Sequence, residues 1–367
     1  MGRMNRRIVA PLLAWYDRNA RVLPWRSDPT PYRVWLSEIM LQQTRVEAVK
    51  PYFERFTGTL PDIASLARTD EQTLMKLWEG LGYYNRARNL QKAAQLVMEE
   101  YGGEMPDDYE SLLRLPGIGP YTAGAVASIA FGEAVPAVDG NVLRVAARLE
   151  ASEENVSRPE VKKRVTENIA DIIPKERAGD FNQALMELGA VVCLPNGAPK
   201  CGECPLCRLC EGFARDIAGL LPVKDEKAAR KIEKRTVFLL RQVWLNAPTA
   251  DRVSVSKSRE DRIAVSKRGQ SGLLAGLWEF PNTQGHLNRK QAKEYLEEIG
   301  IKVGTIEKLF TAKHIFTHRE WHMIAYLVDV AGDGGLVWEP WRVIRESYAL
   351  PSAFAAYTKF LDSLMER

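Results

Sequence analysis

Apolar residues recur at every third or fourth position through the first two thirds of the chain, and this spacing predicts amphipathic helices. The clearest helical runs are 71–79, 87–100 and 141–149. Clusters of proline and glycine separate such runs, at 29–31, 80–82, 102–103 and 116–120. The pattern shows little strand character before residue 217, so we expect this part of the chain to be all-helical.

From Thr236 the pattern changes to short stretches that are rich in β-branched and aromatic residues and bounded by turn-forming residues. These stretches predict strands at 236–245, 252–256, 262–267 and 324–330, interrupted by a helix at 289–299. A chain of 367 residues also exceeds what one core ordinarily holds. We therefore expect a helical domain at 1–217, a linker at 218–234 and an α+β domain at 235–367.

Composition narrows the class of protein only modestly. The chain is 46% hydrophobic and 27% charged, which is ordinary for a soluble globular protein, and no apolar stretch is long enough to cross a bilayer. The short apolar segment after the basic N-terminus contains Trp15, Asp17 and Arg18, which is unlike a signal peptide. We expect a bacterial cytoplasmic protein. The net charge of +4 permits nucleic-acid binding but does not indicate it.

The run at 115–121 carries two glycines, Gly117 and Gly119, between two apolar segments. Glycine permits a positive φ and the close approach of a ligand, and Pro120 is suited to the first position of a helix. The N–H groups at that helix start would face an anion such as phosphate. The run resembles the helix-hairpin-helix motif of the DNA base-excision glycosylases, which implies that Gly117, Gly119 and Tyr121 contact the DNA backbone.

All five cysteines lie between positions 193 and 210, which in a reducing compartment indicates a metal site. All-thiolate ligands suit zinc or a [4Fe–4S] cluster. The cluster resembles the iron–sulfur loop of the endonuclease III and MutY branch, although the first gap here is longer, with the extra residue in 195–199. We favour the four ligands Cys193, Cys201, Cys204 and Cys210, with Cys207 free. The evenly spaced set Cys201, Cys204, Cys207 and Cys210 remains an alternative.

Two carboxylic acids are candidates for catalysis. Glu38 shares a helical face with Val34, Trp35, Leu41 and Gln42, and a carboxyl on such an apolar face has a raised pKa and can deliver a proton near pH 7. Pattern alone is also compatible with a surface or purely structural glutamate at this position.

Asp139 precedes the helical run 141–149 and is expected to be its N-cap. Backbone N–H groups and the helix dipole would then hold its carboxylate ionised. One neutral acid and one anion are what the cleavage of a glycosidic bond through an oxocarbenium-like state requires.

Several motifs stand in the same order as in the adenine DNA glycosylase (MutY) family, which removes adenine mispaired with 8-oxoguanine. They are Trp25-Arg26, 37–44, 80–84, the hairpin at 115–121 and 138–142. The chain resembles this family over nearly its whole length. The resemblance implies a helix-hairpin-helix glycosylase domain with an iron–sulfur loop, followed by an α+β Nudix-like domain.

The resemblance also implies roles for individual residues. Glu38 would protonate N7 of the extruded adenine, and Asp139 would stabilise the oxocarbenium ion, with Asn141 and Tyr121 arranging that site. Lyase-competent relatives carry a lysine where this chain has Tyr121, and a phenol forms no Schiff base. A monofunctional glycosylase is therefore expected. Without the resemblance, Tyr121 would be interpreted as a core tyrosine.

Further residues would bind the base and the surrounding DNA. By resemblance, the adenine pocket includes Trp25, Arg26, Leu41 and Gln183, whose amide can pair with N6 and N7 of adenine. Gln43, beside Thr44, and Tyr83 match residues that wedge into the duplex. The glycines around Leu81 suit a tight loop that reaches into DNA.

The second domain resembles a Nudix fold with an incomplete signature. The segment 293–301 matches the second half of the Nudix box, but Glu279 and Gly285 replace residues of its first half, so pyrophosphohydrolase activity is not expected. The family's recognition loop matches Phe316, Thr317 and His318. The hydroxyl of Thr317 is suited to the N7–H/O8 edge of 8-oxoguanine, although ordinary strand alternation would also explain this stretch.

The expected partner is duplex DNA that contains 8-oxoguanine:A or G:A mispairs, bound by a monomer associated with the nucleoid. The main alternative is a bifunctional pyrimidine glycosylase/abasic lyase, which Tyr121 and the second domain disfavour. A non-catalytic DNA-binding or iron–sulfur sensor protein is an alternative of another class. It predicts that Glu38→Gln leaves function intact.

Overall fold

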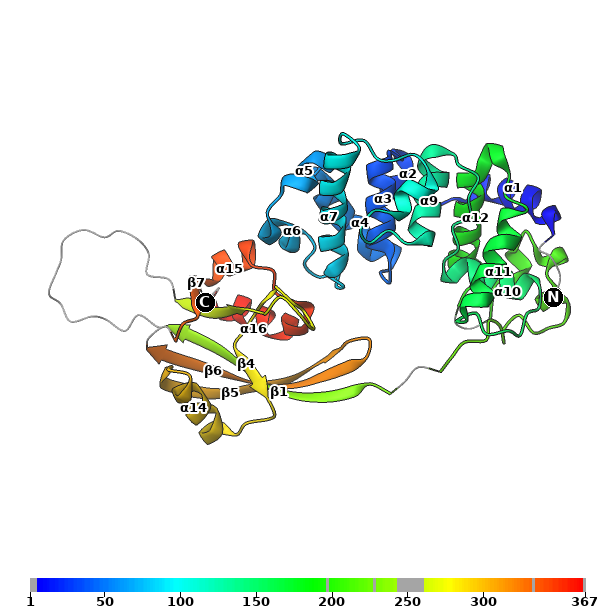
Figure 1. Ribbon diagram of the computed structural model, residues 1–367. Helices are drawn as coiled ribbons and strands as arrows, with labels where there is room; N and C mark the ends of the chain where they lie inside the picture. The colour runs from blue at the N-terminus through cyan, green and yellow to red at the C-terminus, as the bar shows by residue number, and fades with distance from the viewer. Residues whose placement is uncertain (1–4, 196–197, 227–228, 243–260, 332–333, 366–367) are drawn as a thin grey trace. The chain divides into compact units, whose positions relative to one another are not determined.

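The computed structural model describes residues 5–195, 198–226, 229–242, 261–331 and 334–365. The chain divides into two compact units, which we call the helical unit (1–69 and 85–226) and the sheet unit (70–84 and 227–367; Figure 1). The predicted linker at 218–234 spans the point where the helical unit ends. Contacts group 70–84 with the sheet unit, which the sequence pattern does not indicate.

The helical unit contains α-helices and short 3-10 turns in its described residues. Its α-helices are α1 (Val9–Asn19), α2 (Pro24–Ser27), α3 (Pro31–Leu41), α4 (Val46–Thr59), α5 (Ile63–Arg68), α7 (Asn85–Glu100), α8 (Tyr109–Leu113), α9 (Pro120–Phe131), α10 (Gly140–Leu149), α11 (Pro159–Ala170), α12 (Ala178–Val191) and α13 (Glu211–Ala214). Its 3-10 turns are η1 (Arg6–Ile8), η2 (Lys175–Arg177), η3 (Cys201–Glu203) and η4 (Cys207–Leu209).

Local sequence explains where many of these helices begin. Side-chain oxygens of Thr30, Asp62, Asp108 and Asp139 accept hydrogen bonds from backbone N–H groups in the first turns of α3, α5, α8 and α10. Proline occupies the first position of α2, α3, α9 and α11, where its missing N–H has no helical partner to lose. Polar caps and proline therefore fix the helix starts that carry the site.

A buried apolar core joins α1, α10, α11 and α12. Leu12, Ala146, Ile169 and Phe181 contribute one fully or almost fully buried side chain from each of these helices. Helix α9 packs against both α3 and α12, and its Gly124 lets the segment before α10 approach closely, because a Cβ there would lie 2.1 Å from the carbonyl oxygen of Pro136. This packing brings α3, α9, α10 and α12 together around one cavity.

In its described residues, the sheet unit is built on a mixed seven-stranded sheet. Its strands are β1 (Lys231–Gln242), β2 (Arg262–Lys267), β3 (Trp278–Glu279), β4 (Asn282–Gln284), β5 (Lys302–Ile315), β6 (Arg319–Ala331) and β7 (Val337–Pro340). The order is β3-β2-β1-β6-β5, with β4 paired to β1 and β7 paired to β2. Strands β1 and β6 are parallel, and the other pairs are antiparallel.

Alternating residues of β1 serve the two faces of the sheet. Val237 and Leu239 pack against α15 (Trp341–Ser347), η5 (Ser352–Phe354) and α16 (Ala355–Met365), whereas Phe238 and Leu240 pack against α14 (Arg289–Glu298) (Figure 1). The remaining helix, α6 (Glu71–Leu77), contacts α15. The sheet is therefore covered by helices on both faces.

The prediction of an all-helical domain followed by an α+β domain is confirmed. The predicted helix at 289–299 is α14, and the predicted strands at 236–245, 262–267 and 324–330 fall on β1, β2 and β6, with 243–245 outside the described residues. The predicted strand at 252–256 also lies outside them. No helix in the described part of the chain is long and apolar enough to cross a membrane.

Candidate active site

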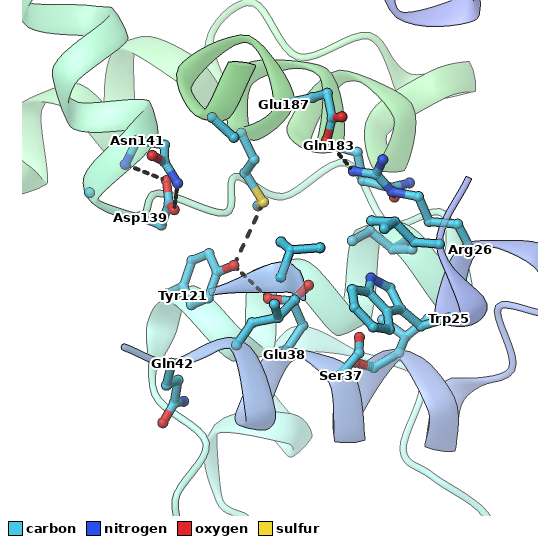
Figure 2. Close-up of a pocket in the computed structure, with 18 of the residues that line it drawn as sticks. Trp25, Arg26, Ser37, Glu38, Gln42, Tyr121, Asp139, Asn141, Gln183 and Glu187 are labelled. Atoms are coloured by element: carbon cyan, nitrogen blue, oxygen red, sulfur yellow. Dashed lines mark hydrogen bonds and ion pairs between the residues drawn. The ribbon is translucent and has the colours of Figure 1, made fainter. Parts of the chain in front are cut away.

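The helical unit holds a cavity of about 880 Å³ between α3, α9, α10, α12 and the segment around α2 (Figure 2). Many of the residues singled out in the sequence line it: Trp25, Arg26, Glu38, Leu41, Gln43, Thr44, Tyr121, Asp139, Asn141 and Gln183. A cavity of this volume can accept a purine base together with its sugar. The fold thus brings together residues that are up to 158 positions apart, from Trp25 to Gln183.

Glu38 lies in the last turns of α3 and is 7% exposed. Burial raises the pKa of its carboxyl to about 7, and the charge of Asp139 acts in the same direction. The phenol O–H of Tyr121 donates to Oε2 of Glu38 at 2.5 Å and opposes this rise. The predicted proton donor is therefore in place, with a pKa near the pH at which it would act.

Tyr121, the second residue of α9, points toward Glu38 (Figure 2). Burial and the neighbouring carboxylates raise the pKa of its phenol well above the ordinary value, so it stays a hydrogen-bond donor. Its oxygen also lies 3.6 Å from Sδ of Met186. The resemblance implied that Tyr121 arranges the site of Asp139, but the hydrogen bond that it makes is to Glu38.

Asp139 is the N-cap of α10, as the sequence predicts. Its Oδ1 accepts from the backbone N–H groups of Asn141 and Val142, both at 2.8 Å, and its Oδ2 accepts from the Asn141 amide at 2.7 Å. These bonds favour the anion, but burial is the larger effect and raises the pKa of Asp139. Capping alone does not account for the pKa of Asp139, because desolvation acts against it.

An ion-pair network closes the cavity on the side of α12. Glu187, which is 1% exposed, accepts from Arg21 at 2.5 Å and from Arg26 at 2.9 Å. Burial raises the pKa of Glu187, but the two guanidinium groups together outweigh burial and lower it below the ordinary value. Nε of Arg26 also donates to Oε1 of Gln183 at 3.0 Å. This bond sets the orientation of the Gln183 amide, with its oxygen toward Arg26.

The turn after α3 presents Gln43 at the cavity mouth. Gln43 is exposed and has φ 59°, a left-handed conformation that is unusual for a residue other than glycine. On either side, the Gln42 amide donates to the hydroxyl of Thr122 at 3.4 Å, and Thr44 N–H donates to Leu41 O at 3.2 Å. The two predicted DNA-contacting residues Gln43 and Thr44 therefore lie on one tight turn beside Glu38.

The hairpin forms between α8 and α9. Gly117 has φ 80°, and a Cβ there would lie 2.7 Å from Cβ of Asn89, so both its backbone and its packing require glycine. Gly119 is the N-cap of α9 with an extended backbone, and a Cβ there would meet nothing within 4 Å. Of the two glycines, only Gly117 needs its conformational freedom; Gly119 leaves open space in front of the helix N-terminus.

The remaining predicted contact residues belong to the sheet unit. The hydroxyls of Tyr83, 47% exposed and with φ 48°, and Thr317 are 2.7 Å apart. Thr317 lies in the turn between β5 and β6 beside Phe316, whose ring packs edge-on against Trp321, and beside the exposed His318. Leu81, which lies between two glycines in the same segment, is 7% exposed.

Glu279, which replaces a glycine of the Nudix box, forms an ion pair with Arg268 and accepts from the Asn282 amide at 2.8 Å. Along α14, Nζ of Lys290 lies 3.8 Å from Oε1 of Glu294, and Nζ of Lys293 lies 3.8 Å from Oε1 of Glu297. These carboxylates are engaged by side chains of the protein itself, which accords with the broken signature.

The five cysteines line one small cavity, together with Arg148. A guanidinium N–H of Arg148 donates to Sγ of Cys193 at 3.2 Å, and Sγ of Cys210 lies 3.3 Å from the Arg148 carbonyl. Burial raises the pKa of Cys204 to about 12. In the described residues, no three His, Cys, Asp or Glu side chains are grouped to hold a single metal ion. Within the segment 195–199, to which the extra residue of this loop was assigned, residues 196–197 lie outside the described part.

The side chains of the site that have no counterpart among the residues predicted from the sequence include Arg21, Arg86, Met186 and Glu187. Glu187 lies one helical turn after Gln183, so an acid facing the same cavity could have been inferred from that spacing. Arg86 and Met186 carry no such local signal, because their partners lie 42 or more positions away.

Sequence comparisons agree with this geometry. Residues 36–171 match the HhH-GPD superfamily of base excision DNA repair proteins, and residues 252–359 match the NUDIX domain family. A thermostable thymine-DNA glycosylase of known structure is similar, with a TM-score of 0.52 and 30% identity, and the match covers 57% of this chain and 97% of that one.

Relatives with a known activity cover most of the chain. An adenine DNA glycosylase of Mus musculus is 35% identical over 94% of this chain and 77% of its own length. One from Buchnera aphidicola subsp. Acyrthosiphon pisum is 34% identical over 86% of this chain and 85% of its own. Both matches run through the two units, and together with the cavity they show that this chain belongs to the adenine DNA glycosylase family and is a monofunctional enzyme of base excision repair.

Proposed function

We propose that this enzyme removes adenine mispaired with 8-oxoguanine or guanine in duplex DNA. The observation that carries the proposal is the pair of carboxyls in one cavity, the buried Glu38 with a pKa of about 7 and the partly buried Asp139 with three N–H donors. The cavity and the turn that would read the opposite base come from one chain, which supports a monomer. A DNA substrate would place the protein at the nucleoid of a bacterial cytoplasm.

In the proposed reaction, Glu38 donates its proton to N7 of the extruded adenine. The C1′–N9 bond breaks, its electron pair leaves with the base, and positive charge develops on the sugar. The carboxylate of Asp139 stabilises that charge and can bond C1′ transiently, while the Asn141 amide holds Oδ2 in place at 2.7 Å. Water then adds at C1′, its proton passes to a carboxylate, and an abasic site remains.

A phenol at position 121 supports the absence of lyase chemistry, because Tyr121 cannot form an imine with the abasic aldehyde. Lys162 also lines the cavity, so it is the amine to monitor. We expect no covalent product when borohydride is added to the enzyme and abasic DNA. Should a product form, its loss in Lys162→Ala would identify the amine and refute the assignment.

We propose that the Tyr83 and Thr317 hydroxyls, 2.7 Å apart, form the reader of the base opposite adenine. A hydroxyl can accept from N7–H of 8-oxoguanine, which guanine lacks, and can donate to O8. The exposed ring of Tyr83 is suited to stacking between bases. This reader would favour 8-oxoguanine:A over G:A.

We further propose that the cysteine cavity holds a [4Fe–4S] cluster. Support comes from five sulfur donors around one cavity and from the Arg148 guanidinium, which would stabilise thiolates. Such a cluster holds its ligand sulfurs further apart than a single ion does. Iron content and visible absorbance of purified Cys193→Ser and Cys207→Ser proteins test the ligand set. Loss in Cys193→Ser but not in Cys207→Ser is expected, and the opposite result would favour the alternative set.

The experiment that tests the proposed function is single-turnover adenine release from duplexes that contain 8-oxoguanine:A, G:A or T:A, with an 8-oxoguanine:C duplex as a blank. We expect fast adenine release from the 8-oxoguanine:A duplex, slower release from the G:A duplex and none from the T:A or 8-oxoguanine:C duplex. Glu38→Gln should abolish release while DNA affinity is retained. No release from the 8-oxoguanine:A duplex, by an enzyme that binds it, would refute the proposal.

A further inference from the structure

Arg86, the second residue of α7, reaches the C-terminal end of α3. Its Nη1 donates to three backbone carbonyls, those of Ile39 at 2.7 Å, Met40 at 2.9 Å and Gln42 at 2.8 Å. Its Nη2 also lies 3.4 Å from the hydroxyl of Thr44. One guanidinium therefore contacts the residues on both sides of Gln43.

These carbonyls need an outside partner. The last four C=O groups of a helix have no intrahelical donor, and α3 carries neither a basic residue in its last turn nor a glycine after it. A cation at this end also interacts favourably with the helix dipole. The cap that most helices obtain from their own sequence is supplied here by a side chain of another helix.

The capped turn carries a conformational cost. Gln43 has φ 59°, and a residue other than glycine keeps such a backbone only where the surrounding structure imposes it. Hydrogen bonds to Gln42 O and to the Thr44 hydroxyl hold the two neighbours of Gln43. Asn89, about one turn further along α7, packs against Gly117 of the hairpin, so α7 braces both elements.

We propose that Arg86 is a positioning residue that presets the Gln43 turn for insertion into the DNA duplex, so that adenine can be extruded. This inference rests on the proposed function, in which Gln43 enters the duplex beside the target base. Lysine would keep the charge but cannot reproduce the planar fork of donors that spans the carbonyls and the hydroxyl. The loss should therefore appear in extrusion and not in proton transfer from Glu38.

The test compares Arg86→Lys with the parent enzyme on two substrates in single-turnover assays. In one, adenine is paired opposite guanine; in the other, it stands opposite an abasic-site analogue, where extrusion is cheap. We expect Arg86→Lys to lose about ten- to one-hundredfold on the paired substrate, as one or two charged hydrogen bonds would predict. On the unpaired substrate the rate of Arg86→Lys should fall less than about threefold. The pH above which the excision rate begins to decline should be the same as in the parent enzyme.

Two further variants complete the test. Arg88→Lys is the matched control, because it makes the same substitution on α7 at a residue that donates to Asn85. It should leave the excision rates on the paired and the unpaired substrate unchanged. Gln43→Ala should show the same substrate-dependent loss, and Arg86→Lys should add little to it in the double variant, because both act through one turn.

Equal losses on the two substrates, or fully additive losses in the double variant, would overturn the role of Arg86. If Gln43→Ala itself loses nothing on the paired substrate, the insertion role of Gln43 in the proposed function fails instead. Fluorescence of 2-aminopurine next to the target adenine separates the steps, because impaired extrusion delays the fluorescence rise before any base is released.

Discussion

Removing the Tyr121 hydroxyl is expected to extend adenine excision to higher pH. Burial raises the pKa of Glu38 to about 7, and the hydrogen bond from Tyr121 is the main effect that lowers it. That bond is 2.5 Å long and joins a phenol to a carboxylate, so it stabilises the anion more than the acid. Phenylalanine keeps the ring and its packing but cannot donate, so Tyr121→Phe should raise the pKa of Glu38 further.

The size of the effect follows from the kind of bond that is lost. A hydrogen bond to a charged group contributes about 1.5–3 kcal/mol, and each pKa unit corresponds to about 1.36 kcal/mol. The pKa of Glu38 should therefore rise by about one to two units. Because the protonated acid is the active form, the rate of the parent enzyme should fall tenfold per pH unit above about 7. In Tyr121→Phe the fall should begin at about pH 8 to 9.

The assay is single-turnover adenine release at saturating enzyme across this pH range, and the quantity compared is the pH at which the rate bends. A lower plateau in Tyr121→Phe does not affect that comparison. Tyr109→Phe, in the hairpin helix α8, is the matched control and should leave the bend where it is. A bend in Tyr121→Phe that stays at the parental pH, or moves lower, would show that the hydroxyl does not stabilise the Glu38 carboxylate.

Three further outcomes are expected. The pKa of Glu38 rises from 4.5 to about 7 on folding, so at pH values above 7 the ionised carboxyl destabilises the folded state by about 3 kcal/mol. Glu38→Gln should therefore be more stable than the parent by that amount near pH 8, and no more stable below pH 4.5. Urea unfolding at the two pH values measures this difference. Asp139→Asn should retain the α10 cap, lose less than about 1 kcal/mol in thermal unfolding and yet lose excision. Thr317→Ala should reduce the preference for 8-oxoguanine:A over G:A by about tenfold in single-turnover rates, since Tyr83 loses its partner.

The parts of the site that the sequence predicts are those that depend on neighbouring residues. Asp139 as an N-cap follows from the helical run behind it, and the burial of Glu38 follows from the apolar residues one turn away on α3. Pro120 starts α9 because proline suits a first helical position. Each of these predictions needs only a few residues of context, and each is confirmed.

Other parts depend on contacts between distant segments, which periodicity does not report. The left-handed backbones of Gln43 and Tyr83 are not indicated by residue type, since residues other than glycine seldom adopt them. The grouping of 70–84 with the sheet unit rests on pairs such as Lys76 with the Tyr348 carbonyl, 272 positions apart. The same holds for the cap that Arg86 provides, since nothing near α3 in the sequence indicates that its C-terminal carbonyls are satisfied by another helix.

The prediction made for the two carboxyls rested on an incomplete argument. Glu38 is buried and Asp139 is partly buried, and desolvation raises the pKa of both, so position on a helix does not by itself make one an acid and the other an anion. What separates them is the number of donors that replace water: three N–H groups face Asp139, and one phenol faces Glu38. A proton entering the pair therefore settles on Glu38, because Asp139 would lose more hydrogen bonding by accepting it. The donor count, and not the N-cap alone, assigns the acid to α3 and the cation-stabilising anion to α10.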